Sequence, residues 1–144
     1  MSSDLLDLAR QLIRCKSVTP EDAGCQQILV ERLSGVGFKT EQINSGPVTN
    51  MWATHGDGRP VFVFVGHTDV VPTGPLSEWK YDPFEGVVAD GYLHGRGSSD
   101  MKGGVAAFTK AACDFVQAHP DHNGTLAFII TSDEEGVATD GTVK

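Results

Sequence analysis

Val61-Phe-Val-Phe-Val-Gly-His-Thr-Asp-Val-Val-Pro72 is a segment that changes character in its middle. The run from Val61 to Val65 is β-branched and aromatic without interruption, which predicts a strand covered on both faces. Gly66 ends the run, and His67 and Asp69 follow, with side chains that point the same way if the backbone stays extended. An imidazole beside a carboxylate at a strand end suits metal binding or proton transfer, although such pairs also occur in ordinary polar loops.

The sequence before this segment predicts two helices and two strands. Leucines at helical spacing follow Ser3 and Asp4, either of which can cap a helix that ends near Lys16. Pro20, with acids directly after it, is predicted to begin a second helix that ends at Gly35. The expected strands are 38–43 and 50–55, and the glycine-rich turn 56–58 is predicted to join the second of them to Val61 as a hairpin.

The sequence after this segment predicts a β-α-β unit. Residues 86–94 are typical of two short strands about a turn. Apolar residues at steps of three and four predict a helix from Met101 to His119, and Thr125–Thr131 is a second uninterrupted apolar strand. A helix between two buried strands predicts an α/β fold with a mixed, largely parallel sheet and helices on both faces. The length of 144 residues allows one such domain.

The composition argues against several classes of function. A net charge of −8 and a pI of about 4.9 argue against nucleic acid or an anionic membrane as a partner. Cys15, Cys25 and Cys113 are odd in number and lack Cys-x-x-Cys spacing, which argues against a disulfide framework or a thiolate zinc site. Acids at Asp4 and Asp7 argue against a signal peptide, so a cytoplasmic protein is expected.

Polar residues that can bind a metal follow both predicted apolar strands and the turn between them. They are His67 and Asp69, then Asp100, then Glu134 and Glu135. Ligands of α/β sheets bind at the carboxyl ends of the strands, so the fold is expected to bring these residues together. Four carboxylates in one place repel each other unless cations are present. Nitrogen and oxygen ligands without sulfur suit catalytic Zn²⁺, with Co²⁺ or Mn²⁺ as substitutes.

Other interpretations of these residues lack a supporting pattern. The glycine-rich turn before Asp100 has an acid where a dinucleotide-binding motif requires its third glycine, and it has no Lys-Ser/Thr pair of a phosphate-binding loop. Ser98 and Ser99 lack the Gly-x-Ser-x-Gly pattern of a nucleophile. Glu134 and Glu135 taken alone would be a solvated loop pair, but they come directly after an apolar strand.

Three segments resemble, in order, the signatures of the dinuclear zinc amidohydrolases and exopeptidases, a family that includes aminoacylase-like enzymes. These segments are Gly66–Pro72, Gly95–Gly104 and Ile130–Gly136. Ser99, where the family often has alanine, and His94, where an aromatic residue is expected, depart from the pattern. The resemblance therefore implies a fold of the zinc-exopeptidase type.

The resemblance also implies a role for each candidate residue. His67 is expected to bind one zinc ion, Glu135 the other, and Asp100 both. Asp69 is expected to orient His67, and Glu134 to act as the general acid and base. The peptide bond after Asp100 is expected to be cis.

The same resemblance implies hydrolysis of an amide in a small N-acylated amino-acid substrate by a homodimeric enzyme. Family members take a further glutamate, a further histidine and a dimerisation domain from later sequence, so residues 1–144 are expected to be the N-terminal portion of a catalytic domain and inactive alone. The incomplete sheet is expected to have an unpaired edge and an exposed apolar face, and to self-associate. A related deacylase or dipeptidase and a non-catalytic metal-binding or interaction module are the alternatives.

Overall fold

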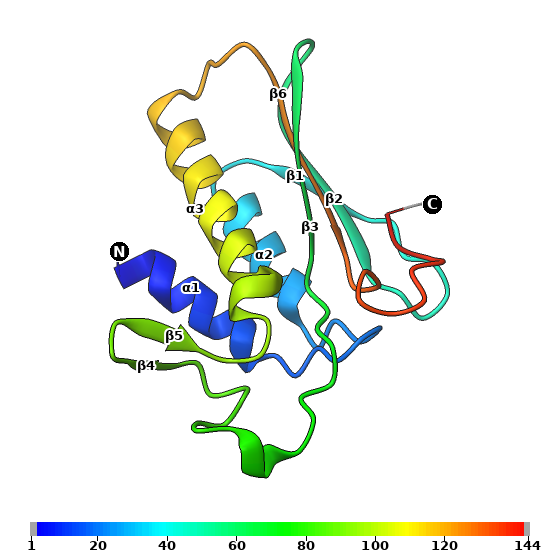
Figure 1. Cartoon of the computed structure of the whole chain (residues 1–144). Coiled ribbons are helices and arrows are strands. Elements are labelled where there is room, and N and C mark those ends of the chain that lie inside the picture. Colours follow the sequence, from blue (N-terminus) through cyan, green and yellow to red (C-terminus); the bar gives the residue numbers. More distant parts are fainter. Residues whose placement is uncertain (1–2, 143–144) are drawn as a thin grey trace.

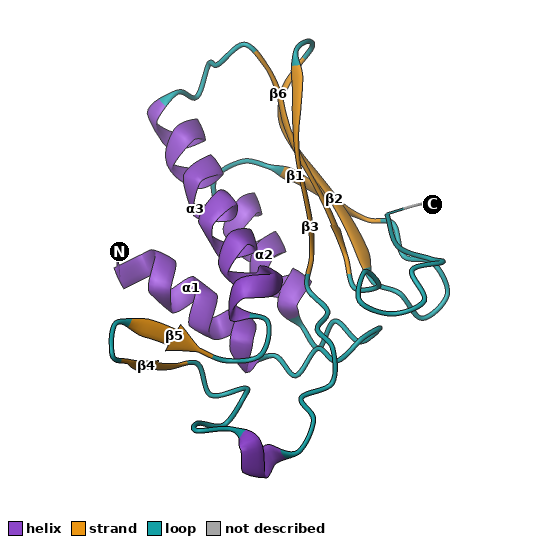
Figure 2. Cartoon of the chain, in the orientation of Figure 1, coloured by secondary structure: helices purple, strands orange, loops and turns teal. Residues whose placement is uncertain are grey.

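A four-stranded sheet and three helices form the body of the described chain (Figures 1 and 2). The computed structural model describes residues 3–142, so the first two and the last two residues of the predicted domain 1–144 lie outside the described part. The helices are α1 (Ser3–Arg14), α2 (Cys25–Ser34) and α3 (Gly103–Ala118), with short helical segments η1 (Leu76–Glu78) and η2 (Ser98–Lys102). The strands are β1 (Lys39–Gln42), β2 (Asn50–Asp57), β3 (Val61–His67), β4 (Val87–Ala89), β5 (Tyr92–His94) and β6 (Gly124–Thr131).

The strand that comes last in the sequence, β6, lies inside the sheet. The strand order is β1-β2-β6-β3, with β6 antiparallel to β2 and parallel to β3. The predicted β-α-β unit is therefore confirmed as β3-α3-β6. The predicted hairpin between β2 and β3 is wrong, because the turn after β2 bends the chain but β6 separates the two strands. Phe128 and Ile130 of β6 are fully buried, which favours this central place.

All three helices lie on one side of the sheet (Figure 1). The mixed α/β sheet is confirmed, but two of its three strand pairings are antiparallel and its other face is bare of helices in the described chain. Phe64 of β3 faces the helices, where its ring stacks on Phe108 at a centroid distance of 5.1 Å. Val61, Val63 and Val65 point to the other face because side chains alternate along a strand, and all three are exposed. The prediction that this run is covered on both faces is wrong, and the predicted exposed apolar face is confirmed.

The core lies between the helices and the sheet. It contains apolar residues of α1, α2 and α3 packed on β2 and β6, with Phe64 of β3 against them. The fully buried members include Leu8, Leu12, Leu29, Leu33, Met51, Val105, Phe128 and Ile130. Among residues 3–142, no helix combines the length and the apolar character needed to cross a membrane.

The start of α2 differs from the prediction. The helix begins at Cys25 rather than at Pro20, because Ala23 and Gly24 adopt left-handed backbone angles, with φ of 51° and 87°. The Asp22 carboxylate accepts hydrogen bonds from the backbone N–H groups of Gly24 and Gln26. Asp22 therefore lies before the helix, whose N-cap is Gly24, and accepts a backbone N–H of the first turn instead of lying within that turn. The predicted first helix and the β4-β5 turn are confirmed.

Candidate metal centre

The parallel pairing of β3 with β6 brings two of the predicted polar clusters together. His67, the last residue of β3, pairs with Thr131, the last residue of β6. The next residue, Thr68, continues the pairing, since its backbone N–H donates to the Thr131 carbonyl over 2.9 Å. The loops that carry Asp69 and Glu134 therefore leave the sheet side by side.

Asp69 lies between the end of β3 and the loop of Glu134 and Glu135, and it is fully buried. Its carboxylate accepts the backbone N–H of Glu134 at 3.1 Å and that of Glu135 at 3.0 Å. Burial opposes ionisation of the carboxyl group, but the hydrogen bonds from His67 and from these amides outweigh it and lower the Asp69 pKa. A buried carboxylate with these partners fixes the backbone of the glutamate loop against β3.

His67 is held so that one ring nitrogen faces the acidic residues. Its Nδ1 lies 3.0 Å from the backbone carbonyl oxygen of Asp69 and 3.4 Å from the Asp69 carboxylate. A carbonyl oxygen only accepts, so Nδ1 donates its hydrogen, and removal of the second ring proton would leave the lone pair on Nε2. Nε2 lies 3.2 Å from Asp100 Oδ1 and 3.7 Å from Glu134 Oε2. This is the tautomer that a metal-binding histidine requires.

The protonation of His67 reflects these acidic neighbours. Burial lowers the stability of the imidazolium, but the hydrogen bonds and the charge of Asp69, together with the hydrogen bond to Asp100, raise the His67 pKa to about 9. A divalent cation would replace that proton and satisfy the same carboxylates, because both species are attracted by the same negative charge.

Asp100 reaches His67 from the turn that precedes α3. Its peptide bond with Met101 is cis, which confirms the sequence-based expectation. Gly97 has a φ of 80°, and a Cβ there would lie 2.5 Å from Val70, so the turn admits only glycine at this position. Lys102 is fully buried, and its Nζ donates to the Cys15 carbonyl over 2.8 Å. The turn is therefore tied to the loop after α1, with the Asp100 carboxylate left exposed at the site.

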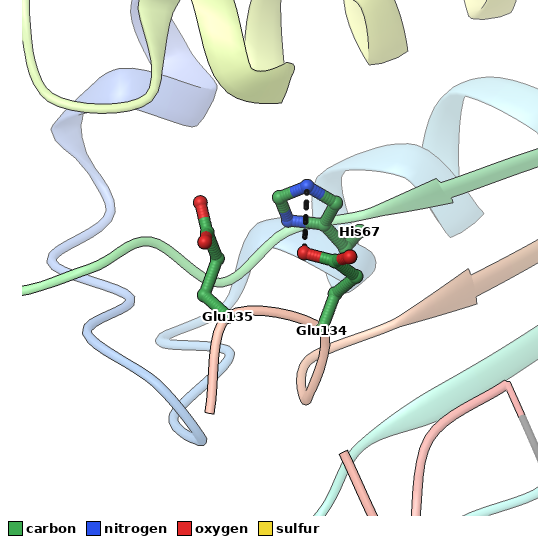
Figure 3. A group of neighbouring side chains, drawn as sticks. All are labelled: His67, Glu134 and Glu135. Carbon is green, nitrogen blue, oxygen red and sulfur yellow. Dashed lines mark ion pairs between the residues drawn. The ribbon is translucent and has the colours of Figure 1, made fainter. Parts of the chain in front are cut away.

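Glu134 and Glu135 complete the cluster (Figure 3). One potential ligand atom from each of these residues and one from His67 lie within 4.8 Å of one another. Burial and the nearby charge of Asp100 raise the Glu135 pKa, which is the expected response of a carboxyl group in a negative environment. The donor set of imidazole nitrogen and carboxylate oxygens, crowded with like charge, fits a divalent cation such as Zn²⁺. Asp100 also lines, with Glu135, a cavity of about 400 Å³ next to this cluster.

The contacts of two residues that support the site were not predicted from the sequence, although one of them, Lys102, lies within the family-like segment Gly95–Gly104. Asp22 accepts the hydroxyl hydrogen of Thr68 over 2.6 Å and so fixes the residue between His67 and Asp69. Lys102 is the second, because a lysine after the Asp100 turn would ordinarily be a solvated helix residue. Only the folded arrangement shows that both side chains are buried and hydrogen bonded.

Comparisons with known sequences place these features in a family. Residues 63–144 match the profile of peptidase family M20/M25/M40. A succinyl-diaminopimelate desuccinylase of Xanthomonas campestris pv. campestris (strain B100) is 60% identical over 141 residues, which are 98% of this chain and 38% of that protein. The protein of the same name from Marinobacter nauticus is 55% identical over 99% of this chain and 38% of its own length. The chain thus spans less than two fifths of these relatives.

Solved structures show the same fold at lower sequence identity. Human carnosine dipeptidase 1 superimposes with a TM-score of 0.80 and 24% identity over 94% of this chain and 33% of that chain. A metallo-carboxypeptidase from Sulfolobus solfataricus superimposes with a TM-score of 0.77 and 22% identity over 94% of this chain and 31% of that chain. These likenesses concern the fold of the chain.

Proposed function

The chain belongs to peptidase family M20/M25/M40, and we propose that it is part of a metal-dependent hydrolase that cleaves N-succinyl-LL-2,6-diaminopimelate to succinate and LL-2,6-diaminopimelate. The observation that carries the proposal is the meeting of His67, Asp100, Glu134 and Glu135 at the carboxyl ends of β3 and β6. The identity of 60% to a succinyl-diaminopimelate desuccinylase, over 98% of the chain, supports this substrate.

The proposed metal ligands in this chain are His67, Asp100 and Glu135. Their nitrogen and oxygen atoms suit Zn²⁺, with Co²⁺ or Mn²⁺ as substitutes, and two ions are proposed for the complete site. A divalent cation bound there supplies positive charge that polarises an amide carbonyl and makes water more acidic. Asp69 keeps the Nδ1 hydrogen of His67 in place, so that Nε2 stays available as a ligand.

Glu134 is the proposed general base and acid. Its side chain is exposed to the solvent side of the cluster, and its Oε2 lies 3.7 Å from His67 Nε2. From this position it takes a proton from the water that attacks the succinyl amide carbon. It then gives the proton to the departing amine, so one carboxylate serves both halves of the reaction.

Residues 1–144 are proposed to be the N-terminal portion of the catalytic domain. The relatives are longer, since the chain spans 38% of their length. We propose that the remainder supplies the further metal ligands and a dimerisation domain. The proposed enzyme is a cytoplasmic homodimer of diaminopimelate and lysine biosynthesis, with no nucleic-acid or membrane partner.

Hydrolysis by the Zn²⁺-loaded full-length enzyme, of which residues 1–144 are the proposed N-terminal portion, tests the proposed substrate. Rates on N-succinyl-LL-2,6-diaminopimelate, N-acetylornithine and dipeptides are compared side by side, and the succinylated compound is expected to give the highest kcat/KM. Faster hydrolysis of either competitor would overturn the substrate assignment, and hydrolysis of none of them would overturn the proposed activity.

Glu134→Gln tests the proposed general base. We expect kcat to fall by about 10²–10⁴-fold, because the amide cannot accept the proton of the attacking water. Zn²⁺ binding, measured by calorimetry, is expected to persist because Glu134 is not a proposed ligand. Glu41→Gln on the exposed strand β1 is the matched control and is expected to retain activity. An unchanged kcat in Glu134→Gln would contradict the assigned role.

A further inference from the structure

Arg96 lies beside the candidate metal centre and has no acidic partner among the described residues. It follows β5 in the turn Gly95-Arg96-Gly97, and it lines the same cavity of about 400 Å³ as Asp100 and Glu135. Among the residues that line this cavity, it is the one with a cationic side chain. Within residues 3–142, no carboxylate forms an ion pair with Arg96, and its buried Nε has no hydrogen-bond partner.

The backbone of Arg96 is fixed on both sides. Its N–H donates to the Pro83 carbonyl over 2.7 Å. A Cβ on Gly95 would lie 2.5 Å from Ile13, and a Cβ on Gly97 would lie 2.5 Å from Val70. The backbone on both sides of Arg96 therefore packs closely against Ile13 and Val70, which fixes the position from which the arginine side chain extends.

An aromatic ring holds the guanidinium group of Arg96. Its Cζ lies 5.1 Å from the centroid of the Trp79 ring, within the range of a cation–π contact. The indole is itself fixed, because Trp79 Nε1 donates to the Thr73 carbonyl over 3.0 Å. The guanidinium is thus held in place while its hydrogen-bond donors remain unused by the described chain.

Other arginines of this chain use their donors within the protein. Arg10 Nε donates to the Gly86 carbonyl at 3.0 Å, Arg14 Nε donates to the Glu85 carbonyl at 3.2 Å, and Arg32 pairs with Asp4 at 2.8 Å. A buried donor without a partner is destabilising, so the arrangement at Arg96 favours a ligand that accepts its hydrogen bonds. A planar guanidinium matches a carboxylate through two parallel hydrogen bonds.

We propose that Arg96 binds a carboxylate of the substrate while the adjacent acidic cluster holds the metal that acts on the amide. This inference rests on the proposed function for the identity of the substrate, which carries a carboxylate on its succinyl group and others on its amino-acid part. The cavity is lined by the carboxylates of Asp100 and Glu135 and by the cationic Arg96. An acyl amino acid with its carboxylate on Arg96 would therefore extend its amide toward the acidic cluster. Arg96 is then a substrate-binding and specificity residue.

Kinetics of Arg96→Gln and Arg96→Lys, each made in the metal-loaded full-length enzyme, test this role. We expect Arg96→Gln to raise KM for the succinylated substrate by about 10–100-fold, the equivalent of one lost charge-assisted interaction, with a change in kcat below about threefold. Arg96→Lys is expected to recover part of the loss, because it restores the charge without the planar fork. Arg59→Gln removes the same charge from an exposed turn and is the matched control.

Two substrate analogues identify the carboxylate that Arg96 binds. If it is the succinyl carboxylate, Arg96→Gln leaves KM for the acetyl analogue unchanged. If Arg96 binds a carboxylate of the amino-acid part, Arg96→Gln leaves KM unchanged for the analogue in which that carboxylate is replaced by a carboxamide. A rise in KM of equal size for all substrates, accompanied by a lower Tm, would overturn the proposal and show that Arg96 only supports Trp79.

Binding of succinate, measured by calorimetry, separates this inference from the proposed reaction. A wild-type protein that hydrolyses none of the substrates, but binds succinate at least about tenfold more tightly than Arg96→Gln does, would support Arg96 as a carboxylate site while the proposed activity fails. Hydrolysis with unchanged KM and unchanged succinate binding in Arg96→Gln would support the activity and overturn the role of Arg96. Absence of both hydrolysis and succinate binding in the wild type would overturn both.

Discussion

In the segment Val61–Asp69, the apolar first half (Val61–Val65) is largely exposed and the polar second half (Gly66–Asp69) is buried, which is the opposite of what side-chain polarity predicts. Val61 and Val65 are 52% and 53% exposed, whereas His67 and Asp69 are 4% and 0% exposed. The valines are exposed because no described element packs on their face of the sheet. The polar residues are buried because each has hydrogen-bond partners from another loop. Burial along this strand therefore follows from the available partners rather than from side-chain polarity.

The largest effect is expected from a substitution of Asp69 in the buried polar half of the segment. Asp69→Asn removes the charge that faces His67 and places an N–H₂ group among backbone donors. We expect the affinity for Zn²⁺ to fall by about 10–100-fold, in line with changes at residues that orient metal ligands, and the chain to be destabilised by about 2 kcal/mol. Calorimetry and denaturant unfolding measure the two quantities. Asp57→Asn at the exposed end of β2 is the control, and equal affinities in the two variants would contradict the role of Asp69.

The next largest effect is expected from substitutions on the two faces of strand β3, in the apolar half of the segment. Phe64→Ala removes a partly buried ring that packs on Phe108 and Phe128, and we expect it to lower the free energy of unfolding by about 1–2 kcal/mol. Val63→Lys changes the adjacent residue on the bare face, and we expect a change within about 0.5 kcal/mol. Urea denaturation with a common m value measures both variants.

Val63→Lys is also expected to change the self-association of the chain. The bare apolar face and the edge of β3 predict self-association of the 144-residue chain, which Val63→Lys is expected to weaken because a charge opposes both contacts. Sedimentation velocity at several concentrations measures the change. A wild-type chain that stays monomeric at every concentration would contradict the predicted self-association through this face and edge.

The smallest effect concerns a histidine pair at the other end of the sheet from His67. His55 Nδ1 lies 2.9 Å from His122 Nε2, and burial together with the charge of His122 lowers the His55 pKa below its usual 6.5. The unfolded chain therefore takes up this proton first. The contribution of His55 to stability is complete above pH 6.5 and is lost as the pH falls below that value. His67 has the opposite sign, since its contribution is complete below pH 6.5 and is lost as the pH rises through about 9.

His122→Gln isolates the His55 contribution, because the His67 contribution is common to both proteins. Between pH 7 and pH 5.5 we expect Tm to fall less in the variant than in the wild type, with a difference below about 4 °C. His119→Gln, which changes a histidine of the same loop without removing the His55 contact, is the control. A variant whose Tm falls as steeply as that of the wild type would show that the pair does not set this pH dependence.

The order of the elements was predictable from the sequence, whereas the neighbours of each strand were not. Apolar periodicity predicted α3 and β6, and the turn residues predicted β4 and β5. The pairing of β6 with β2 could not be read from periodicity, because a hydrophobic strand carries no mark of its partner. For the same reason the sequence could not show that one face of β3 is bare in the described chain.

The candidate site divides in the same way. Its residues were predictable because His67, Asp100 and Glu135 follow glycines or strand ends in a recognisable order. The supporting contacts of Asp22 and Lys102 were not, because each joins segments far apart in the sequence through a single buried side chain. The absence of an acidic partner for Arg96 is likewise a property of the folded chain, seen in residues 3–142.

The central position of β6 also has a consequence for synthesis of the protein on the ribosome. While the chain is shorter than about 124 residues, β2 and β3 are already made but the strand that joins them has not yet emerged. At a rate of about 5–20 residues per second, the apolar edges of both strands remain unpaired for several seconds after β3 leaves the ribosome. Nascent chains are therefore most open to wrong strand pairing, and to binding by chaperones, just before Gly124–Thr131 appears.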